Sequence, residues 1–451
     1  MPKSGLVQGR GSKPRQIVPR LLAALAGAAL LALAGCSTPC DVRLCAPIEA
    51  NTSASPPPRS DEAARRYEPA PTAAPVENSA IRTVAIDGPD SQAPAPQERM
   101  APSNGATGPV VRIGLILPLR SAALAAPADA LRAGFMAAFE RDQAGFEIKL
   151  IETGDNPQDT LEAYRSAVEQ SDIVVGPLAR SAVSALAASN LVTKPTIALN
   201  HPEVRGRELP ANLLIVGLSI EDEARQVAEW AADEQPSGTA MIITGSSAWQ
   251  RRIANSFAAR WKQLGHASQQ LVLADSNGYL SEAALAQLRG QIEGAAPVLI
   301  FTALDPSQAG QVRAAAGSAL PFYGTSSVNP GADATNMIAD LVGVRMLDLP
   351  WEVQPGHAAA MVYPRFVPAG GPASGQALDM DRLYALGIDS FRIAREISLR
   401  SKDGNGASFT LDGVTGNLTV DFGKGQARFN RVQRAAIYQG GGFSLIGPAT
   451  R

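Results

Sequence analysis

The sequence predicts an α/β protein of two similar lobes, preceded by a secretory leader and a disordered linker rich in proline and alanine. Three observations lead to this prediction. From residue 110 onward, short apolar runs alternate with amphipathic stretches, as strands alternate with helices. The alternation occurs in two rounds of similar length, and further helical and strand-like segments follow the second round. Strands that alternate with helices form parallel sheets through right-handed crossovers.

The chain starts with a basic stretch that ends at Arg20, and an apolar run over residues 21–34 follows it. The order basic, apolar, small is that of a secretory signal. The apolar run is shorter than the ~20 residues that a transmembrane helix needs. Its ending, Leu33 to Cys36, resembles the lipobox of bacterial lipoproteins, which implies removal of residues 1–35 and lipidation of Cys36. The alternative is an ordinary secretory signal with an incidental cysteine.

The residue after Cys36 is Ser37 and not Asp, which in lipoproteins of this kind implies an outer-membrane anchor that faces the periplasm. In that oxidising compartment, a disulfide is the expected state of the other two cysteines, Cys40 and Cys45. Two free thiols in a flexible tail are the alternative.

The sequence gives no sign of metal, cofactor or enzyme chemistry. His201, His266 and His357 each stand alone, and no histidine lies near Cys40 and Cys45 to complete a zinc site. The motifs G-x-S-x-G, S-x-x-K, H-E-x-x-H and the P-loop are all missing from the sequence. A net charge of -2 and 5% aromatic residues provide no basic, base-stacking surface for nucleic acid. We expect a protein that is not an enzyme and has no nucleic-acid partner.

Residues 36–109 are expected to hold the lipidated cysteine and a disordered linker. From residue 46 the segment is rich in proline and alanine, and Tyr67 is its one aromatic residue. Such a composition cannot bury a core. A coil of about 70 residues has a reach of order 50 Å, so the linker is predicted to be a tether.

The first lobe is expected to begin at residue 110. Apolar runs that end at Gly or Pro indicate buried strands, and stretches with one apolar face indicate helices between them. The predicted strands are residues 111–117, 146–151, 172–175, 196–199 and 213–216, and the predicted helices are 127–141, 157–170 and 179–190.

The second lobe is expected to begin with a helix that Ser219 caps, because Asp222 stands at the fourth position of a capping box. That helix is predicted to end near residue 233. The predicted strands that follow are residues 240–243, 270–273, 298–301 and 321–323, and the predicted helices are 248–264, 282–292 and 307–316.

The last part of the chain is expected to return to the first lobe. It contains a strand-like run at residues 341–344, a loop over 351–364, a helix over 378–398 and antiparallel strands within 413–446. We therefore assign residues 110–451 to one two-lobed domain. The first lobe comprises about 110–217 and part of 380–451, and the second comprises about 218–345. Two independent nucleotide-binding-like units would leave the late helix and strands without a place to pack.

Several stretches resemble known families. Residues 111–119, and the pair 172–178 with 194–200, look like strands of type I periplasmic binding proteins. Three further stretches, residues 218–225, 382–391 and 412–418, resemble the LppC-type lipoproteins, the penicillin-binding protein activators, and residues 384–391 and 413–418 are the more distinctive among them. This resemblance implies a type I periplasmic-binding-protein-like fold. Better-known members carry a helical repeat domain ahead of that fold, whereas this chain has the linker there.

Ligands of such sheets bind at the carboxyl ends of the strands, here in a cleft between the lobes. Each candidate also has a structural explanation, because Gly-Pro ends strands, and Ser and Thr cap helices. The loop after the first strand has little polar density, so any small-molecule ligand is expected to bind weakly or not at all. The candidate cleft residues at these ends are Ser121, Gly176, Pro177, Leu178, Asn200, Ser246, Thr302 and Thr325.

Asp389 is a charged residue inside an apolar helical stretch. A buried carboxylate is costly unless it has a partner, so we expect an Arg or a backbone N–H beside it. Its predicted role is to orient the hinge between the lobes, with a place among the cleft residues as the alternative.

The resemblance implies an outer-membrane lipoprotein that binds and activates a bifunctional penicillin-binding protein and so regulates peptidoglycan synthesis. The alternative is a periplasmic receptor for an amino acid or a small peptide. A receptor that hands its cargo to an inner-membrane transporter would be badly placed on the outer membrane. The sequence therefore favours the regulator.

Overall fold

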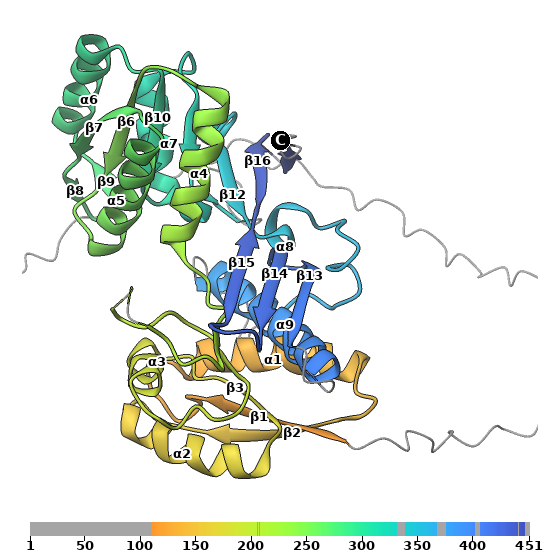
Figure 1. Ribbon diagram of the computed structural model, residues 1–451. Helices are drawn as coiled ribbons and strands as arrows, with labels where there is room; N and C mark the ends of the chain where they lie inside the picture. Colours follow the sequence, from red (N-terminus) through yellow and green to blue (C-terminus); the bar gives the residue numbers. More distant parts are fainter. Residues whose placement is uncertain are drawn as a thin grey trace, which may run out of the picture. The chain divides into compact units, whose positions relative to one another are not determined.

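The computed structural model describes residues 110–204, 206, 208–331, 339–367, 376–401, 406–440 and 442–446. Residues 98–451 form one compact unit, to which all described helices and strands belong. The predicted leader, the three cysteines Cys36, Cys40 and Cys45, and the predicted linker lie outside the described residues. The unit is built on two mainly parallel sheets and a smaller antiparallel sheet (Figure 1).

The first sheet has five parallel strands in the order β2-β1-β3-β4-β5. Its central strands are continuous apolar runs because helices cover both faces. Helices α2 and α3 pack on one face, and α1 and α9 pack on the other. The strands are β1 (Val111–Leu117), β2 (Phe146–Glu152), β3 (Ile173–Val175), β4 (Thr196–Ala198) and β5 (Leu213–Ile215); the helices are α1 (Ala125–Arg141), α2 (Pro157–Gln170), α3 (Arg180–Ala187) and α9 (Gln376–Arg400).

Helices α1 and α9 cross in direct backbone contact. A Cβ atom added at Gly134 would lie 1.9 Å from the carbonyl oxygen of Tyr384. One added at Gly387 would lie 2.1 Å from the carbonyl oxygen of Leu131. Glycine is therefore required on both helices, and Phe391 can pack edge-on against aromatic rings of α1.

A three-stranded antiparallel sheet covers the other side of α9. Its strands are β13 (Ala407–Gly413), β14 (Gly416–Phe422) and β15 (Arg428–Val432). Every second residue of β14 is buried, as expected for a strand with one face on the core. Leu418 and Val420 share the core cluster with Ile393 and Ile397 of α9. We call the five-stranded sheet, its four helices and this small sheet the first lobe.

The second sheet has seven strands in the order β17-β16-β12-β11-β10-β6-β7. β16 pairs antiparallel with β12, and β17 pairs antiparallel with β16. Helices α4 and α5 cover one face, and α6 and α7 cover the other. We call this sheet with its four helices the second lobe. The strands are β6 (Thr239–Thr244), β7 (Ala267–Val272), β10 (Leu299–Ala303), β11 (Phe322–Gly324), β12 (Arg345–Asp348), β16 (Arg434–Tyr438) and β17 (Phe443–Leu445); the helices are α4 (Ile220–Glu234), α5 (Ala248–Gln263), α6 (Glu282–Ala295) and α7 (Pro306–Ala316).

The chain crosses between the lobes three times. The first crossing, residues 216–219, joins β5 to α4. The second leaves β12 after Asp348 and passes through the short helix α8 (Pro350–Val353) toward α9. The third is Gln433, between β15 and β16. The crossings lie where the two lobes meet (Figure 1), and side chains of both lobes contact each other there.

Most predicted elements are present, but two local predictions were wrong and one element was not predicted. The strand expected at residues 341–344 lies at β12, because the chain turns at Gly343, which has a φ of 83°. The segment expected as a loop from residue 351 begins with α8. A short hairpin, β8 (Asp275–Ser276) with β9 (Tyr279–Leu280), was not expected. As predicted, Ser219 caps α4 and accepts a hydrogen bond from the backbone N–H of Asp222.

Candidate functional site

The predicted cleft residue Ser121 lies in the loop between β1 and α1. Its side chain is buried, and its hydroxyl donates a hydrogen bond to the carboxylate of Asp155. The same oxygen accepts a hydrogen bond from the backbone N–H of Leu124 at 2.9 Å. The hydroxyl is thus engaged within the first lobe.

Gly176, Pro177, Leu178 and Asn200 are brought together at the ends of β3 and β4. A Cβ atom at Gly176 would lie 2.2 Å from the carbonyl oxygen of Ile116, so close backbone packing requires the glycine. Leu178 is 5% exposed and belongs to the core of the first lobe. The side-chain amide of Asn200 donates to the carbonyl oxygen of Leu178 at 3.1 Å. These contacts hold the two strand ends against each other.

The second-lobe candidates lie near the carboxyl ends of three neighbouring parallel strands, and Thr302 is in register with Gly324, next to Thr325. Ser246 points its hydroxyl toward Asp275 at 3.5 Å. Thr302 is fully buried within β10, and its hydroxyl has no hydrogen-bond partner among the described residues. Thr325 is also fully buried, and it accepts the backbone N–H of Ser327 at the start of the short 3-10 helix η1 (Ser326–Val328).

Asp389 of α9 is fully buried and has the partners expected for it. Its carboxylate accepts the backbone N–H groups of Val414 and Thr415 at 3.2 and 2.8 Å and the Thr415 hydroxyl at 2.7 Å. Arg392 donates to it at 3.1 Å. The Thr415 hydroxyl in turn accepts a hydrogen bond from Nε of Arg431. The other two nitrogens of that guanidinium donate to backbone carbonyl oxygens of the first crossing. Asp389 therefore fixes the turn between β13 and β14 next to the junction.

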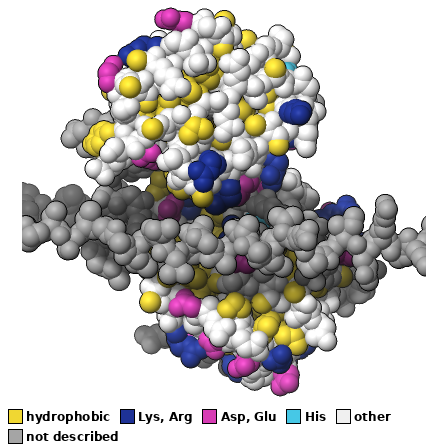
Figure 2. Space-filling view, turned by 90° about the vertical axis from the view of Figure 1, so that its left-hand side faces the viewer, with side chains coloured by type: hydrophobic (Ala, Val, Ile, Leu, Met, Phe, Trp, Pro, Cys, Tyr) yellow, Lys and Arg dark blue, Asp and Glu magenta, His cyan; other side chains and the backbone are white. Residues whose placement is uncertain are grey.

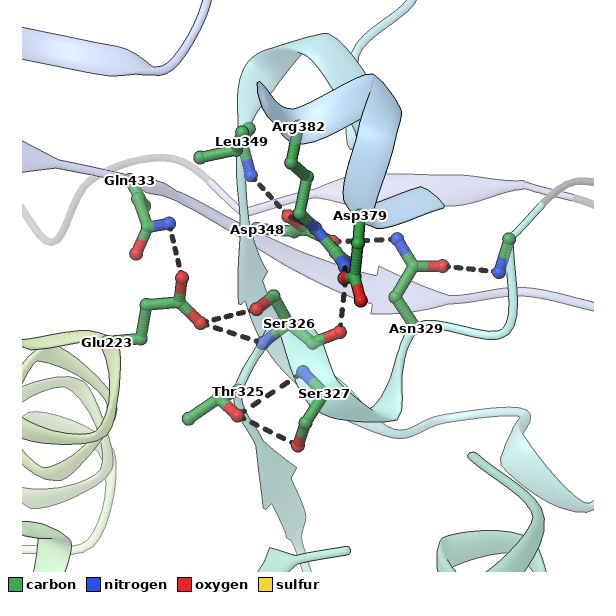
Figure 3. A network of polar contacts seen from close by, with 11 residues as sticks. Glu223, Thr325, Ser326, Ser327, Asn329, Asp348, Leu349, Asp379, Arg382 and Gln433 are labelled. Carbon is green, nitrogen blue, oxygen red and sulfur yellow. Dashed lines mark hydrogen bonds and ion pairs between the residues drawn. The ribbon is translucent and has the colours of Figure 1, made fainter. Parts of the chain in front are cut away.

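A buried polar cluster fills the junction itself (Figure 3). We call Glu223, Ser326, Asp348, Arg382 and Gln433 the interlobe network. Glu223 of α4 accepts the backbone N–H and the hydroxyl of Ser326 at 3.1 and 2.6 Å. The side-chain amide of Gln433, in the third crossing, donates to the same carboxylate at 2.9 Å. Glu223 thus joins the end of β11 to the last crossing.

Arg382 connects the two lobes. It belongs to α9 of the first lobe, and its guanidinium donates to Asp348 at the end of β12 at 2.7 and 3.2 Å. It also donates to the carbonyl oxygen of Ser326 at 3.0 Å. Asn329 donates to the Asp348 carboxylate at 2.8 Å, so the arginine is not its sole partner (Figure 3). Asp348 is 0% exposed and the Arg382 side chain 12% exposed, so the pair is nearly free of solvent.

Burial and neighbouring charges shift several pKa values in this junction. Burial, together with the charge of Asp348, raises the pKa of Glu223. Burial alone would lower the pKa of the Arg382 guanidinium. The charge and the hydrogen bond of Asp348 outweigh burial, so this pKa is raised. Burial lowers the pKa of Arg431 to about 10. The junction therefore holds one strongly favoured cation beside a carboxyl group that tends to bind a proton.

Glu352 of α8 extends the set of carboxyl groups around Asp348. Burial, followed by repulsion from Asp348, raises the pKa of Glu352 to about 8. One of its oxygens is buried without a hydrogen-bond partner among the described residues. A protonated Glu352 is therefore the form that the folded chain favours at neutral pH.

A pocket of about 980 Å³ lies beside the network, between α4 and the β15–β16 segment. Trp230 and Phe429 contribute apolar surface to it, and most of its charged side chains are paired. Arg260 pairs with Glu229 at 2.8 Å, for example. The sequence gave no indication of this pocket, because it is formed by segments that lie about 200 residues apart in the chain. It differs from the predicted cleft, because none of the predicted cleft residues lines it.

Sequence reasoning singled out Asp389 but missed Glu223, Asp348 and Arg382. One signal was available, since each of the three charges stands within an otherwise apolar helix face or strand end. Among the described residues, no group of three or more His, Cys, Asp or Glu side chains could hold a metal ion. Within the same residues, no helix is both long and apolar enough to cross a bilayer.

Among the solved structures that share this fold are the two that follow. One is described as a putative branched-chain amino acid ABC transporter from Chromobacterium violaceum ATCC 12472, and its sequence is 35% identical to this chain. The superposition covers 71% of this chain and 100% of that structure, with a TM-score of 0.55. The other is the LpoA (YraM) C-domain from Haemophilus influenzae, described as a regulator of PBP1A, and its sequence is 20% identical to this chain. The superposition covers 74% of this chain and 100% of that structure, with a TM-score of 0.57. The chain therefore has the predicted α/β, two-lobed type I periplasmic-binding-protein-like fold.

Curated relatives carry the name penicillin-binding protein activator LpoA. The one from Enterobacter sp. (strain 638) is 27% identical in an alignment of 319 positions that covers 61% of this chain and 42% of that protein. The one from Escherichia coli (strain K12) is 28% identical in an alignment of 334 positions that covers 61% of this chain and 44% of that protein. The chain thus spans less than half the length of these relatives. A family model described as LppC putative lipoprotein matches residues 103–435, and this match, over most of the chain, shows that the chain belongs to the LppC lipoprotein family.

Proposed function

We propose that this chain is a lipid-anchored, non-catalytic regulator of peptidoglycan synthesis that binds and activates a bifunctional penicillin-binding protein. The name of its curated relatives supports this proposal. One observation in the structure carries it further: the guanidinium of Arg382, from the first lobe, occupies the carboxyl end of β11 in the second. That end is where sheets of this kind bind ligands. The chain uses the place for a contact between its own lobes.

The contact also opposes the lobe movement that a solute receptor needs. Opening the junction would separate Arg382 from Asp348 and break the buried hydrogen bonds between them. Ser121 and Thr325, two of the predicted cleft hydroxyls, are already engaged within their own lobes. A small-molecule ligand of this cleft is therefore weak or absent in our proposal.

The direct test adds purified residues 98–451 to a bifunctional synthase of the same cell and follows glycan polymerisation and crosslinking separately. We expect binding and a higher rate of at least one of the two reactions. The same unit after thermal unfolding is the control, and it should leave both rates unchanged. Neither binding nor a rate change with any bifunctional synthase of that cell would reject the regulator.

A receptor for an amino acid or a small peptide is the second candidate. The 35% identity to a structure described as a branched-chain amino acid transporter favours it. A ligand present at 100 times its Kd stabilises its receptor by about 2.7 kcal/mol, which is a rise of several degrees in Tm. We expect no such rise in a thermal-shift screen of amino acids and short peptides. Tight binding of one compound would favour the receptor.

We further propose that the leader is removed, that Cys36 is lipidated, and that the outer membrane holds the protein on its periplasmic side. The family description supports a lipoprotein. The linker would then give the folded unit a reach of order 50 Å toward the peptidoglycan layer. Replacing Cys36 with Ser should release soluble or unprocessed protein on fractionation. A Cys36→Ser chain that still sediments with outer membranes would contradict the anchor.

A further inference from the structure

Strand β7 is an edge strand of an unusual kind. It has six residues, Ala267–Val272, and none of them is charged. The other described edge strands of the three main sheets are either short or charged. β5 and β17 have three residues each, whereas β2, β13 and β15 carry Asp, Glu, Lys or Arg side chains. Proteins commonly use short length or charge to keep edge strands from pairing with other chains, and β7 has neither protection.

The outer edge of β7 is also accessible. β7 is the last strand of the seven-stranded sheet (Figure 1), and five of its six residues are exposed. The left-hand side of Figure 1 faces the viewer in Figure 2. On that side, the upper lobe shows mainly uncharged surface, and its charged side chains lie toward the periphery. β7 itself therefore carries no charge that would keep another strand away.

The backbone direction of β7 follows from one hydrogen bond. The N–H of Leu273, just after the strand, donates to the carbonyl oxygen of Thr244 on β6. Backbone groups of alternate residues point to opposite sides of a strand, so Ser268, Gln270 and Val272 direct their N–H and C=O groups away from β6. Among the described residues, these outward groups have no hydrogen-bond partner.

The charges at the two ends of β7 are opposite. Lys262, in the last turn of α5, precedes the strand, and Asp275 follows it. Both are exposed, and neither forms an ion pair with another described residue. Two antiparallel copies of the strand would bring the basic end of one close to the acidic end of the other. Two parallel copies would instead place like charges together.

We propose that two copies of this chain associate through antiparallel pairing of their β7 strands, which joins the two seven-stranded sheets into one continuous sheet. A two-fold axis through Gln270 places Ser268 of each copy opposite Val272 of the other. The outward N–H and C=O groups then satisfy one another. The two Gln270 side chains lie face to face, and a carboxamide both donates and accepts, so it is complementary to itself. This self-complementarity identifies a second copy as the occupant.

The test measures the mass of residues 98–451 by sedimentation velocity across a wide range of concentration. The parent should shift toward twice the monomer mass as its concentration rises. Gln270→Lys and Gln270→Glu each place two like charges across the axis, and each should weaken self-association by at least about tenfold. Gln143→Lys adds the same charge at an exposed turn of the first lobe and should leave association unchanged.

Mixing the two Gln270 variants separates an interface effect from a folding defect. The lysine introduced in one copy would face the glutamate introduced in the other, so a mixture of Gln270→Lys and Gln270→Glu should recover dimers that contain one copy of each. A parent that stays monomeric at all concentrations would overturn the proposal. So would variants that dimerise as the parent does, or a mixture that does not recover. None of these results depends on whether a penicillin-binding protein is the partner.

Discussion

At the scale of single residues, the junction is governed by a few buried charges. Asp348 is completely buried, and it is stabilised by Arg382 and by the Asn329 side chain. A buried ion pair of this kind adds little net stability compared with apolar residues of the same volume. Loss of one member is nevertheless expensive, because the other charge is then left in a medium of low polarity. The network is thus a strong constraint on sequence even if its net stabilisation is small.

Replacing Arg382 with Ala should lower the free energy of unfolding by about 3–5 kcal/mol, because Asp348 and Ser326 lose their shared donor. Chemical denaturation of residues 98–451 measures this change. Arg400→Ala is the matched control on the same helix. Arg400 is half exposed and pairs with Glu396 one turn away, so its loss should cost no more than about 1 kcal/mol. Equal effects of the two substitutions would contradict the role assigned to Arg382.

Glu352 makes stability depend on pH. The folded chain raises the pKa of this carboxyl to about 8, mainly by burial, so the folded state holds a proton that the unfolded state releases near pH 4. The stabilisation linked to this proton is fully present below the unfolded pKa and is lost as pH rises through about 8.

Glu352→Gln removes the titrating proton and keeps the shape of the side chain. The parent should lose free energy of unfolding as the pH is raised from 5 to 9, whereas the variant should not lose this contribution. The difference between the two free energies of unfolding should change by at least about 1 kcal/mol in favour of the variant, because one pKa unit corresponds to ~1.4 kcal/mol. Glu223 also has a raised pKa, but both proteins keep it, so its contribution cancels. Denaturation at a series of pH values gives the difference, and parallel curves would refute the assignment.

At the scale of elements, the contact between α1 and α9 depends on two glycines. An added methyl group at Gly134 or Gly387 meets a backbone carbonyl at about 2 Å, and backbone cannot move aside as a side chain can. Gly134→Ala and Gly387→Ala should each destabilise the unit by about 1–3 kcal/mol or more. Thermal denaturation measures the loss.

Gly290 provides the matched control, because it lies inside helix α6 with no other atom within 4 Å of an added Cβ. Gly290→Ala should stabilise the unit by up to about 1 kcal/mol, since alanine is the better helix former. The same substitution thus has opposite signs at two kinds of helix position. A destabilising Gly290→Ala, or a neutral Gly134→Ala, would show that the contacts assigned to these helices are wrong.

Most elements were predictable because periodicity, caps and breakers are local signals. Helix α2 starts at Pro157 and ends at Gln170, as predicted, because Asn156 caps it and Pro157 fits its first turn. Strand β12 was misplaced because Leu341, Val342 and Val344 form as good an apolar run as the true strand. What separates them is the turn at Gly343, whose N–H bonds to Tyr438 almost a hundred residues later. Such long-range pairing leaves no local signal.

The site was harder to predict than the fold. Asp389 was identified because a charge inside an apolar helix needs a partner, and its partners are present. Arg382 lies on the same helix, but its partners come from β12 and from the end of β11. A helix reveals which of its faces is apolar, but the sequence does not tell which distant strand end its charged residues will reach.

At the scale of the whole molecule, the lobes share elements and should not unfold separately. The first lobe includes α9, which follows the second lobe in the sequence, and the second lobe includes β16, which follows α9. Calorimetry of residues 98–451 should show a single transition. Gly134→Ala in the first lobe and Trp261→Ala in the second should both lower that transition. Two transitions that respond separately to these changes would indicate independent lobes.

The late position of α9 and of the C-terminal strands also bears on how the protein is made. Residues from Gln376 onward supply the central helix of one lobe and two strands of the sheet in the other. During synthesis and the proposed export the earlier residues emerge first, yet neither half can close its core until this last segment arrives. If the chain is exported as proposed, it would therefore still be unfolded while it passes through a translocation pore, which accepts extended chains. A prematurely terminated copy would leave no functional half and would be a uniform target for proteases.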